Sequence, residues 1–340
     1  MKPIFHPKLV NDPFGDPGLL VQFLYESRVL LFDLGNLSRI TNKTLLNVTH
    51  VFVSHTHIDH FIGFDQLLRV CFGRNKTICL YGPENFIANV QGKLAGFTWN
   101  LVDRYAESIT LQVVEVRQEE LLRATFRAVD RFEKTGECRE PFVKGLLWDE
   151  PSFAVHAAIL EHRVPCLGFT LTEKFHVNVR KERLDARDFV PGSWLNELKQ
   201  MIHQKRPDEE LVSVPVSANG KVVNRQYALG ELREDLVLIS PGQKIGYVTD
   251  TVFNKENSAR IVELVRGADR FFCESPFLAE EEERGRERCH LTSKQAGTLA
   301  KMAAVKNLTV FHFSAKHTHR REQLYREAKE AFKAPAHPSV

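Results

Sequence analysis

The sequence predicts an α/β fold in which mixed β-sheets are covered by helices. Short β-branched and aromatic runs recur along the chain, runs with helical periodicity lie between several of them, and the two patterns alternate throughout. The 340 residues are 43% hydrophobic and 26% charged, which is typical of a globular protein and sufficient for one large domain. We therefore expect a single layered α/β domain over residues 1–340.

The first third of the chain supplies mainly strands. The run LLVQFLYESRVLLFDLG indicates two strands joined by a turn at residues 25–28. THVFVS, residues 49–54, and TICLYGP, residues 77–83, indicate two more strands. Apolar spacing predicts a helix over residues 82–97, and LQVVEV, residues 111–116, indicates another strand. Several successive strands are close enough in sequence to be antiparallel neighbours.

The second half continues the alternation. Further strands are indicated by SFAVHAAIL, CLGFTLTE, KIGYVTD, RFFCES and NLTVFHFS, and two helices by SKQAGTLAKMAAV and RREQLYREAKEAFK. Two stretches look inserted into this pattern. Residues 116–150 are charged, and we expect them to be partly helical. Residues 172–212 are basic at first, turn at Pro191-Gly192 and continue into a predicted amphipathic helix. Such a charge run is more often a solvated face than a binding surface.

Composition narrows the classes of protein that fit. The formal charge of +3 and the isoelectric point near 8.5 neither require nor exclude a nucleic-acid partner. No apolar run approaches the length of a membrane span and no signal-peptide pattern is evident, so we expect no membrane association. The six cysteines form no CxxC pair, which is typical of reduced thiols in a cytoplasmic protein. Cys289 adjoins His290, but a packed thiol is favoured over a ligand or nucleophile.

The segment SHTHIDHFIGFD, residues 54–65, carries the strongest chemical signal. It places His55, His57, Asp59 and His60 within six positions, directly after a predicted strand. Imidazole nitrogens and carboxylate oxygens are the usual ligands for zinc, and a His-x-His pair after a strand can point two imidazoles to one side. The alternative, a polar loop satisfied by its neighbours, is less favoured for so dense a cluster. We therefore predict metal binding.

A two-metal site needs partners from elsewhere in the chain. It needs a third imidazole for one ion, a bridging carboxylate, and a further imidazole for the other ion. His162 lies between two strand-like runs, Asp250 ends the strand KIGYVTD, and His312 ends the strand NLTVFHFS. Each alone would more often be a satisfied buried polar residue. Together with the cluster they complete a coordination set.

These residues carry a resemblance to a known family. The HxHxDH segment with His162, Asp250 and His312 resembles the metallo-β-lactamase superfamily. LEHRVPCLGF resembles a ribonuclease Z segment in which a histidine precedes a Gly-aromatic pair, and HFSAKH resembles that branch's His-x-Ser signature. A further segment resembles the branch in having a glutamate, then a His-x-Thr and a Gln-Ala helix: Glu274, His290, Thr292, Gln295 and Ala296. The resemblance extends from about Leu20 to His317.

The resemblance implies a four-layer αββα sandwich, two zinc ions and endonucleolytic cleavage at the 3′ side of tRNA precursors. It also implies a homodimer and a protruding arm that grips the tRNA body. In this chain the arm would be residues 172–212, acting as an exosite. Its candidate nucleic-acid-binding residues are Lys174, Arg180, Lys181, Arg183 and Arg187.

The implied mechanism is metal-assisted hydrolysis of a phosphodiester. The expected ligand sets are His55, His57 and His162 for one zinc ion, Asp59, His60 and His312 for the other, and Asp250 as the bridge. Asp59 would also orient or deprotonate the attacking water. His290 is the candidate donor of a proton to the leaving oxygen, and Glu274 would orient it. Asp33 ends a strand and is expected to support a ligand rather than to be one.

Five features depart from the ribonuclease Z pattern. FDLGNLSRI replaces a Gly-rich turn, NDPFGDPG replaces the usual opening turn, and the stretch at residues 116–150 is longer than expected. In addition, Thr249 precedes Asp250, and Lys316-His317 ends the last signature. None removes a ligand, but they affect the floor and rim of the site. Two alternatives therefore stay open. One is a hydrolase of a small phosphodiester, cyclic nucleotide or lactone. The other is a nucleic-acid-binding protein that keeps the fold without turnover.

Overall fold

The computed structural model describes residues 3–102 and 107–334, which form two compact units. The larger unit comprises residues 4–147, 155–171 and those from 244 onward, and the smaller comprises residues 148–154 and 172–243. Within the described residues, no helix combines the length and apolar character needed to cross a membrane.

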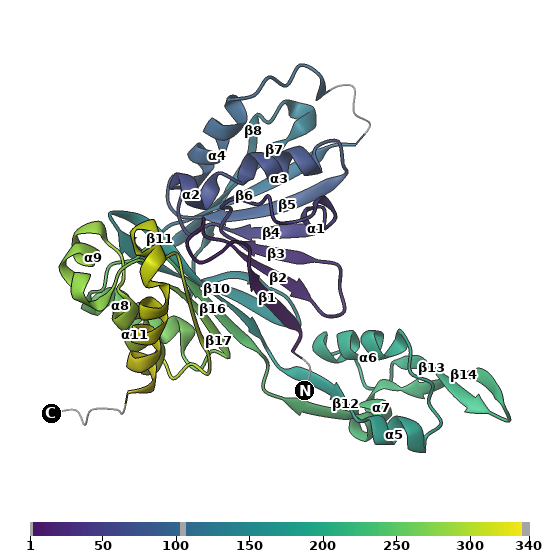
Figure 1. Ribbon diagram of the computed structural model, residues 1–340. Coiled ribbons are helices and arrows are strands. Elements are labelled where there is room, and N and C mark those ends of the chain that lie inside the picture. Colours follow the sequence, from purple (N-terminus) through teal and green to yellow (C-terminus); the bar gives the residue numbers. More distant parts are fainter. Residues whose placement is uncertain (1–2, 103–106, 335–340) are drawn as a thin grey trace. The chain divides into compact units, whose positions relative to one another are not determined.

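An eight-stranded sheet forms one half of the larger unit (Figure 1). Its strands follow one another in chain order: β1 (Phe5–Leu9), β2 (Leu19–Phe23), β3 (Val29–Phe32), β4 (Val48–Phe52), β5 (Lys76–Gly82), β6 (Ile109–Val116), β7 (Glu120–Arg127) and β8 (Lys134–Pro141). The four central strands, β3 to β6, pair in parallel, whereas the strands at both edges pair antiparallel. The parallel strands bring their carboxyl ends to one edge of the sheet.

A six-stranded sheet forms the other half. Its order is β18 (Leu308–Phe311), β17 (Arg270–Glu274), β16 (Lys244–Val248), β11 (Val164–Glu173), β10 (Phe153–His162) and β9 (Leu146–Asp149). β16, β17 and β18 are parallel to one another, so their carboxyl ends also lie together. Strands β9, β10 and β11 have residues in both compact units.

The two sheets pack face to face through aromatic side chains. Phe32 on β3 and Phe52 on β4 both contact the ring of Phe169 on β11, with ring centroids 5.8 Å apart in each pair. Tyr247 on β16 also lies against Phe32, at 5.9 Å. All four rings are almost fully buried, so they contribute large apolar areas to the inner layer of the core.

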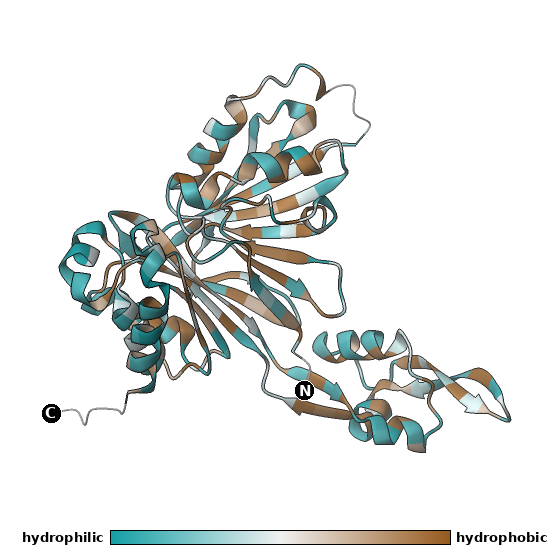
Figure 2. Ribbon diagram, in the orientation of Figure 1, coloured by the Kyte–Doolittle hydropathy of each residue, from teal (hydrophilic) through white to brown (hydrophobic). Residues whose placement is uncertain are grey.

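Helices cover the outer face of each sheet, which completes a four-layer αββα arrangement. The first sheet is covered by α1 (Asn42–Leu45), α2 (Ile58–Phe61), α3 (Phe64–Cys71) and α4 (Phe86–Ala95), and the second by α8 (Lys255–Val265), α10 (Ser293–Met302) and α11 (Arg321–Lys333). The short helix α9 (Glu282–Arg288) lies beside the 3₁₀ turn Ala279–Glu281. Each helix layer shares one buried hydrophobic cluster with its sheet. Hydrophobic residues accordingly recur in the strands and on one side of the helices (Figure 2).

The expectation that residues 116–150 are partly helical is wrong. They complete β6 and form β7, β8 and β9, with only a single 3₁₀ turn at Ala128–Asp130. The charged residues misled the prediction because β7 alternates them with a buried apolar face, including Leu122, Ala124 and Phe126. β8 is exposed along its whole length, and charges on such an edge strand discourage pairing with other chains.

The smaller unit has a hydrophobic core of its own. It contains β12 (His176–Val179), α5 (Lys181–Ala186), α6 (Trp194–His203), β13 (Leu211–Ala218), β14 (Lys221–Ala228), α7 (Leu229–Leu236) and β15 (Val237–Ser240). Trp194 and Leu198 on the predicted amphipathic helix are buried against Val177, Val214 and Leu232. Residues 172–212, the expected arm, lie within this unit, which continues to Gln243.

Candidate metal centre

The predicted metal ligands lie at or just beyond the carboxyl ends of strands in the larger unit. The HxHxDH loop follows β4, His162 ends β10, Asp250 lies just beyond β16, and His312 immediately follows β18. Asp250 and His312 have φ angles of 45° and 60°, which are uncommon for residues other than glycine. Such a backbone turns both side chains sharply out of their strands, and it persists only where the surroundings hold it.

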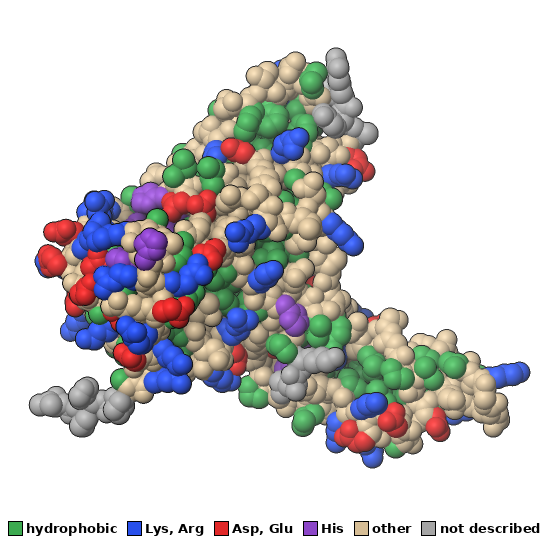
Figure 3. Space-filling view, viewed as in Figure 1, with side chains coloured by type: hydrophobic (Ala, Val, Ile, Leu, Met, Phe, Trp, Pro, Cys, Tyr) green, Lys and Arg blue, Asp and Glu red, His purple; other side chains and the backbone are tan. Residues whose placement is uncertain are grey.

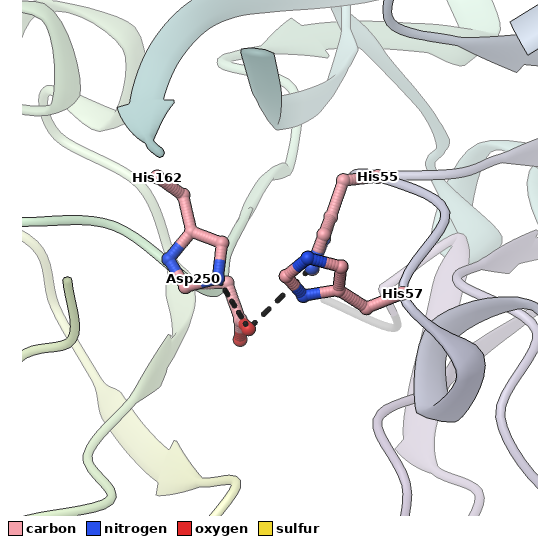
Figure 4. A group of neighbouring side chains, drawn as sticks. All are labelled: His55, His57, His162 and Asp250. Carbon is pink, nitrogen blue, oxygen red and sulfur yellow. Dashed lines mark ion pairs between the residues drawn. The ribbon is translucent and has the colours of Figure 1, made fainter. Parts of the chain in front are cut away.

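Asp250 lies at the centre of the arrangement, with one carboxylate oxygen directed to each ligand group. Its Oδ2 is 3.6 Å from His55 Nε2 and 3.3 Å from His162 Nε2 (Figure 4). Its Oδ1 is 3.5 Å from His60 Nε2 and 2.9 Å from His312 Nδ1. A carboxylate with this division of contacts can bridge two ions.

The remaining predicted ligands complete the two groups. The ring of His57 lies 4.3 Å from that of His55 and 5.3 Å from that of His162, between centroids. Asp59 Oδ2 lies 3.5 Å from His60 Nε2 and 3.3 Å from His312 Nε2. We call His55, His57 and His162 the first ligand group and Asp59, His60 and His312 the second. In each group, the potential ligand atoms lie within 4.8 Å of one another.

Two buried imidazole nitrogens indicate whether the candidate metal centre suits a cation. His55 Nε2 and His60 Nε2 are both inaccessible to solvent and have no hydrogen-bond partner in the structure. A buried polar atom without a partner is unfavourable, so these nitrogens need a further interaction. Both face carboxylate oxygens across gaps of about 3.5 Å, into which a metal ion bound by nitrogen and oxygen would fit. The donor set therefore suits a cation.

Hydrogen bonds to the other ring nitrogens hold the imidazoles in this orientation. Asp33 accepts hydrogen bonds from His60 Nδ1 at 2.9 Å, the backbone N of Ser54 at 2.6 Å and the hydroxyl of Tyr247 at 2.9 Å. His162 Nδ1 donates to the carbonyl of Cys289 at 2.7 Å. Partners of this kind fix the tautomer and direct Nε2 to the ion.

Sequence reasoning placed Asp33 in this supporting role but missed Ser54 and Tyr247. Ser54 directly precedes the histidine cluster, so its position could have indicated this role. Tyr247 lies within the strand KIGYVTD, where nothing in the sequence distinguishes it from a core residue. Thr249, noted only as a departure, donates its hydroxyl hydrogen to Asp250 Oδ1 at 2.8 Å. Cys289 contributes its backbone carbonyl, and no cysteine belongs to the candidate metal groups found among the described residues.

His290 and Glu274 lie beside both ligand groups. His290 Nδ1 is 2.8 Å from Glu274 Oε2, and its ring centroid is 4.9 Å from that of His162 and 5.8 Å from that of His312. Glu274 is fully buried at the end of β17, and its Oε1 accepts the backbone N–H groups of Thr251 and Leu291. These bonds fix the carboxylate, which in turn orients the imidazole.

A hollow of about 410 Å³ lies next to His290. It is lined by Phe253, Glu282, Glu283, Arg286, His290 and Gln295. Near α9, histidine side chains reach the surface among acidic and basic ones (Figure 3). Thr292 and Gln295, which carried part of the family resemblance, form a reciprocal capping box that starts α10. Their contribution is thus to fix the helix that follows His290.

The two ligand groups differ in charge. Burial, reinforced by His60, lowers the pKa of His55 to about 2, and burial also lowers the pKa of His57. Burial opposes protonation of His60 as well, but Asp250 and Asp33 outweigh it and raise its pKa to about 10. In the same way Asp250 raises the pKa of His312 well above the usual value. Without a metal, His55 and His57 are neutral, while His60 and His312 carry protons.

The predicted nucleic-acid-binding residues lie in the smaller unit, where most of them have partners. Lys174 pairs with Asp149 at 2.6 Å, and the Arg180 guanidinium donates to the carbonyl of Glu234 at 2.9 Å. Arg183 pairs with Asp235, and Arg187 pairs with both Glu231 and Asp235. For Lys181, the structure records no ion pair within its described residues. Thus three of the five cations face carboxylates of their own unit.

Comparison with known proteins finds relatives in sequence and neighbours in fold. The sequence matches no family model. It is 28% identical to "Ribonuclease Z" of Deinococcus radiodurans over 309 residues, which cover 90% of this chain and 87% of that protein. It is 27% identical to "Ribonuclease Z" of Nitrosopumilus maritimus over 350 aligned residues, covering 97% of this chain and 94% of that protein.

Solved structures show the same fold. The metallo-β-lactamase-fold protein YhfI from Bacillus subtilis aligns with a TM-score of 0.54 and 16% identity, covering 96% of this chain and 94% of that one. The short form of human tRNase Z aligns with a TM-score of 0.50 and 17% identity, covering 92% of each chain. The expected αββα sandwich is confirmed. The chain has the metallo-β-lactamase fold, and the ribonucleases Z are its relatives in sequence.

Proposed function

We propose that this protein is a metal-dependent hydrolase that cleaves the 3′ ends of tRNA precursors as an endonuclease. The observation that carries the proposal is the division of Asp250 between two ligand groups, one oxygen to each. This arrangement suits a two-ion site for phosphodiester hydrolysis. The substrate is proposed from the relatives named Ribonuclease Z, which this chain matches over about 90% of its length.

Two zinc ions per chain fit the ligand chemistry. The first would be held by His55, His57 and His162, the second by Asp59, His60 and His312, and both by Asp250. Bound ions would supply an activated water and neutralise phosphate oxygens. The imidazole-rich first group favours zinc over magnesium or calcium, which prefer oxygen ligands.

Asp59 is the candidate group for handling the attacking water. Burial opposes its ionisation, but the hydrogen bond from His312 and the charge of His60 outweigh this and lower its pKa to about 2. The carboxylate is therefore ionised at neutral pH, and its oxygens would accept a hydrogen bond from a water bound between the two groups. It can orient that water and receive its proton.

His290 is the candidate proton donor to the leaving 3′ oxygen. Burial opposes its protonation, but Glu274 outweighs this effect and raises the pKa of His290, which favours the protonated imidazole that a proton donor requires. Because Glu274 holds Nδ1, the other nitrogen, Nε2, is left to face a substrate. The neighbouring hollow of about 410 Å³ offers room for the nucleotide that carries the leaving oxygen.

The remaining features are proposed with the function. Basic residues of the expected arm, 172–212, would contact the tRNA body through phosphates. Among them Lys181 is best placed, because it forms no ion pair with the residues that the structure describes. We also propose that the protein acts as a homodimer in the cytoplasm. The six cysteines are all free thiols, which suits a reducing compartment.

The test compares two substrates on purified, zinc-loaded protein. One is a tRNA precursor with a 3′ trailer, and the other is bis(p-nitrophenyl) phosphate. We expect one cut at the 3′ end of the tRNA body, with competition by unlabelled precursor. Turnover of the small diester without cleavage of the precursor would favour the small-substrate hydrolase instead. Bound zinc with no turnover of either would favour a binding protein.

A further inference from the structure

The loop that carries His312 is held by a segment from the opposite end of the chain. His312 has a φ angle of 60°, and the next residue, Phe313, leads into a short 3₁₀ segment at Ala315–Arg320. A left-handed conformation is unfavourable for histidine and is retained only when the surroundings fix it. The direction of the His312 ring therefore depends on what holds Phe313.

Two contacts from the N-terminal loop hold Phe313. Its backbone N donates a hydrogen bond to the carbonyl of Pro13 at 2.6 Å. Its ring packs edge-on against Phe14, with centroids 5.2 Å apart and planes at 73°. On its other side the ring packs against Tyr325 of α11, also at 5.2 Å. Phe313 is 3% exposed, so the contacts with Phe14 and Tyr325 are part of the packing that encloses its ring.

An ion pair fixes the N-terminal loop in turn. Arg321, the first residue of α11, donates from Nη2 to both carboxylate oxygens of Asp12, at 2.8 and 2.9 Å. Its guanidinium also lies 5.1 Å from the centroid of the Phe14 ring. Asp12 Oδ1 also accepts a hydrogen bond from the backbone N–H of Phe14 at 3.1 Å. The same carboxylate therefore stabilises the turn at residues 12–14 and links that turn to α11 through Arg321. Asp12 and Arg321 are each 42% exposed, which makes the pair a weak source of stability and leaves position as its main effect.

We infer that Asp12, Phe14 and Arg321 form a clamp that positions His312 for a divalent metal ion in the second ligand group. Asp12, Pro13 and Phe14 belong to NDPFGDPG, the segment that departs from the ribonuclease Z pattern. These are positioning residues that act through Phe313. Among the residues that the structure describes, the three clamp residues make no contact with His55, His57 or His162. The inference rests on the proposed metal-binding function and predicts a defect confined to one of the two ions.

The test measures zinc binding directly. Wild type, Arg321→Gln and Phe14→Ala would be dialysed against zinc buffers of graded free concentration, and bound zinc counted per chain. We expect two ions in the wild type. In both variants the first ion should bind as before, and the affinity for the second should fall by about 10–100-fold, as for loss of an outer-shell partner. Co²⁺ absorption spectra would report the altered second site independently.

Arg320→Gln is the matched control. Arg320 is adjacent in sequence and forms an ion pair with Glu280 at 2.7 Å, but it does not touch the N-terminal loop in the recorded contacts. The Arg320→Gln variant should bind both ions with the affinity of the wild type. Asp12→Asn combined with Arg321→Gln should cost less than the sum of the two single changes, because both remove the same ion pair. Phe14→Leu, a milder change, serves if Phe14→Ala fails to fold.

The outcomes separate the two proposals. Second-ion affinities within twofold of wild type in Arg321→Gln and Phe14→Leu would overturn the clamp. An equal loss of both ions in these variants would overturn it as well, because the contacts would then act on general stability. A wild type that binds no zinc would overturn the proposed metal site, and the clamp with it.

Discussion

The two ligand groups on either side of Asp250 reach a similar geometry by different electrostatics. In the first, the buried His55 is neutral and its Nε2 has no hydrogen-bond partner. In the second, His60 and His312 are protonated and surrounded by Asp33, Asp59 and Asp250. The second group is therefore stabilised by ion pairs even without a metal, although His60 Nε2, like His55 Nε2 in the first group, has no hydrogen-bond partner among the described residues. Similar ligand types can thus be prepared for metal in opposite protonation states.

Removing the residue common to both groups should have the largest effect. Asp250→Ala should lower the affinity for both ions by more than about 10²-fold, since even outer-shell partners contribute about 10–100-fold to metal affinity. Activity should fall below detection. His312→Ala should mainly affect the second ion. Elemental analysis of both variants after zinc supplementation checks this, and retention of one tightly bound ion in Asp250→Ala would contradict the bridging role.

His290 tests whether a residue adjoining both groups is a ligand or an acid. His290→Ala should retain both ions and lower turnover of RNA by roughly 10²–10⁴-fold, because the leaving oxygen would depart without a proton. The defect should shrink on bis(p-nitrophenyl) phosphate, whose leaving group needs none. His319→Ala, at an exposed position, is the control. Equal losses on both substrates with zinc retained would argue for phosphate binding instead.

Proton release should distinguish the two groups directly. His60 and His312 have raised pKa values, so they are protonated at neutral pH and must each lose a proton to bind an ion. Second-site affinity should therefore fall as pH falls, with a slope approaching two protons per ion. His55 and His57, with lowered pKa values, are already neutral and should add no such slope at the first site.

Calorimetric zinc titrations between about pH 6 and 8, in buffers of different ionisation enthalpy, would count the protons released by each ion. Equal proton release from both sites would contradict the prediction that His60 and His312 are protonated before metal binds while His55 and His57 are neutral.

Changes in the smaller unit should have the smallest effect and leave both ligand groups intact. Lys181→Ala should weaken precursor binding and reduce the salt slope by about 1, as expected for one phosphate contact. Arg183→Ala should have less effect, because Asp235 already neutralises that guanidinium. Filter binding at several salt concentrations checks this, with zinc content and bis(p-nitrophenyl) phosphate turnover as controls. An unchanged salt slope in Lys181→Ala would remove this residue from the proposed interface.

The sequence by itself predicted the layered α/β fold and the residues that converge at its centre. The HxHxDH cluster could be identified as a metal site because four side chains of the types that bind metals lie within six consecutive positions. His162, Asp250 and His312 could be identified because each lies at or just beyond the end of a recognisable strand. For Asp250 and His312, the parallel strands β16, β17 and β18 also bring their carboxyl ends to one edge of the sheet. His290 has no local signal and was found only through the family resemblance.

Tertiary structure decided what depends on partners distant in sequence. Within residues 116–150, β7 became a strand because its alternating apolar side chains could be buried in the core of the first sheet, which local charge did not reveal. The ion pairs of Arg183 and Arg187 with Asp235 span 52 and 48 residues, so the basic series looked unpaired in the sequence. The clamp joins Asp12 to Arg321 across 309 residues. Composition and spacing reveal which chemical groups are present, but only the packed chain determines which charges meet and which imidazoles are protonated.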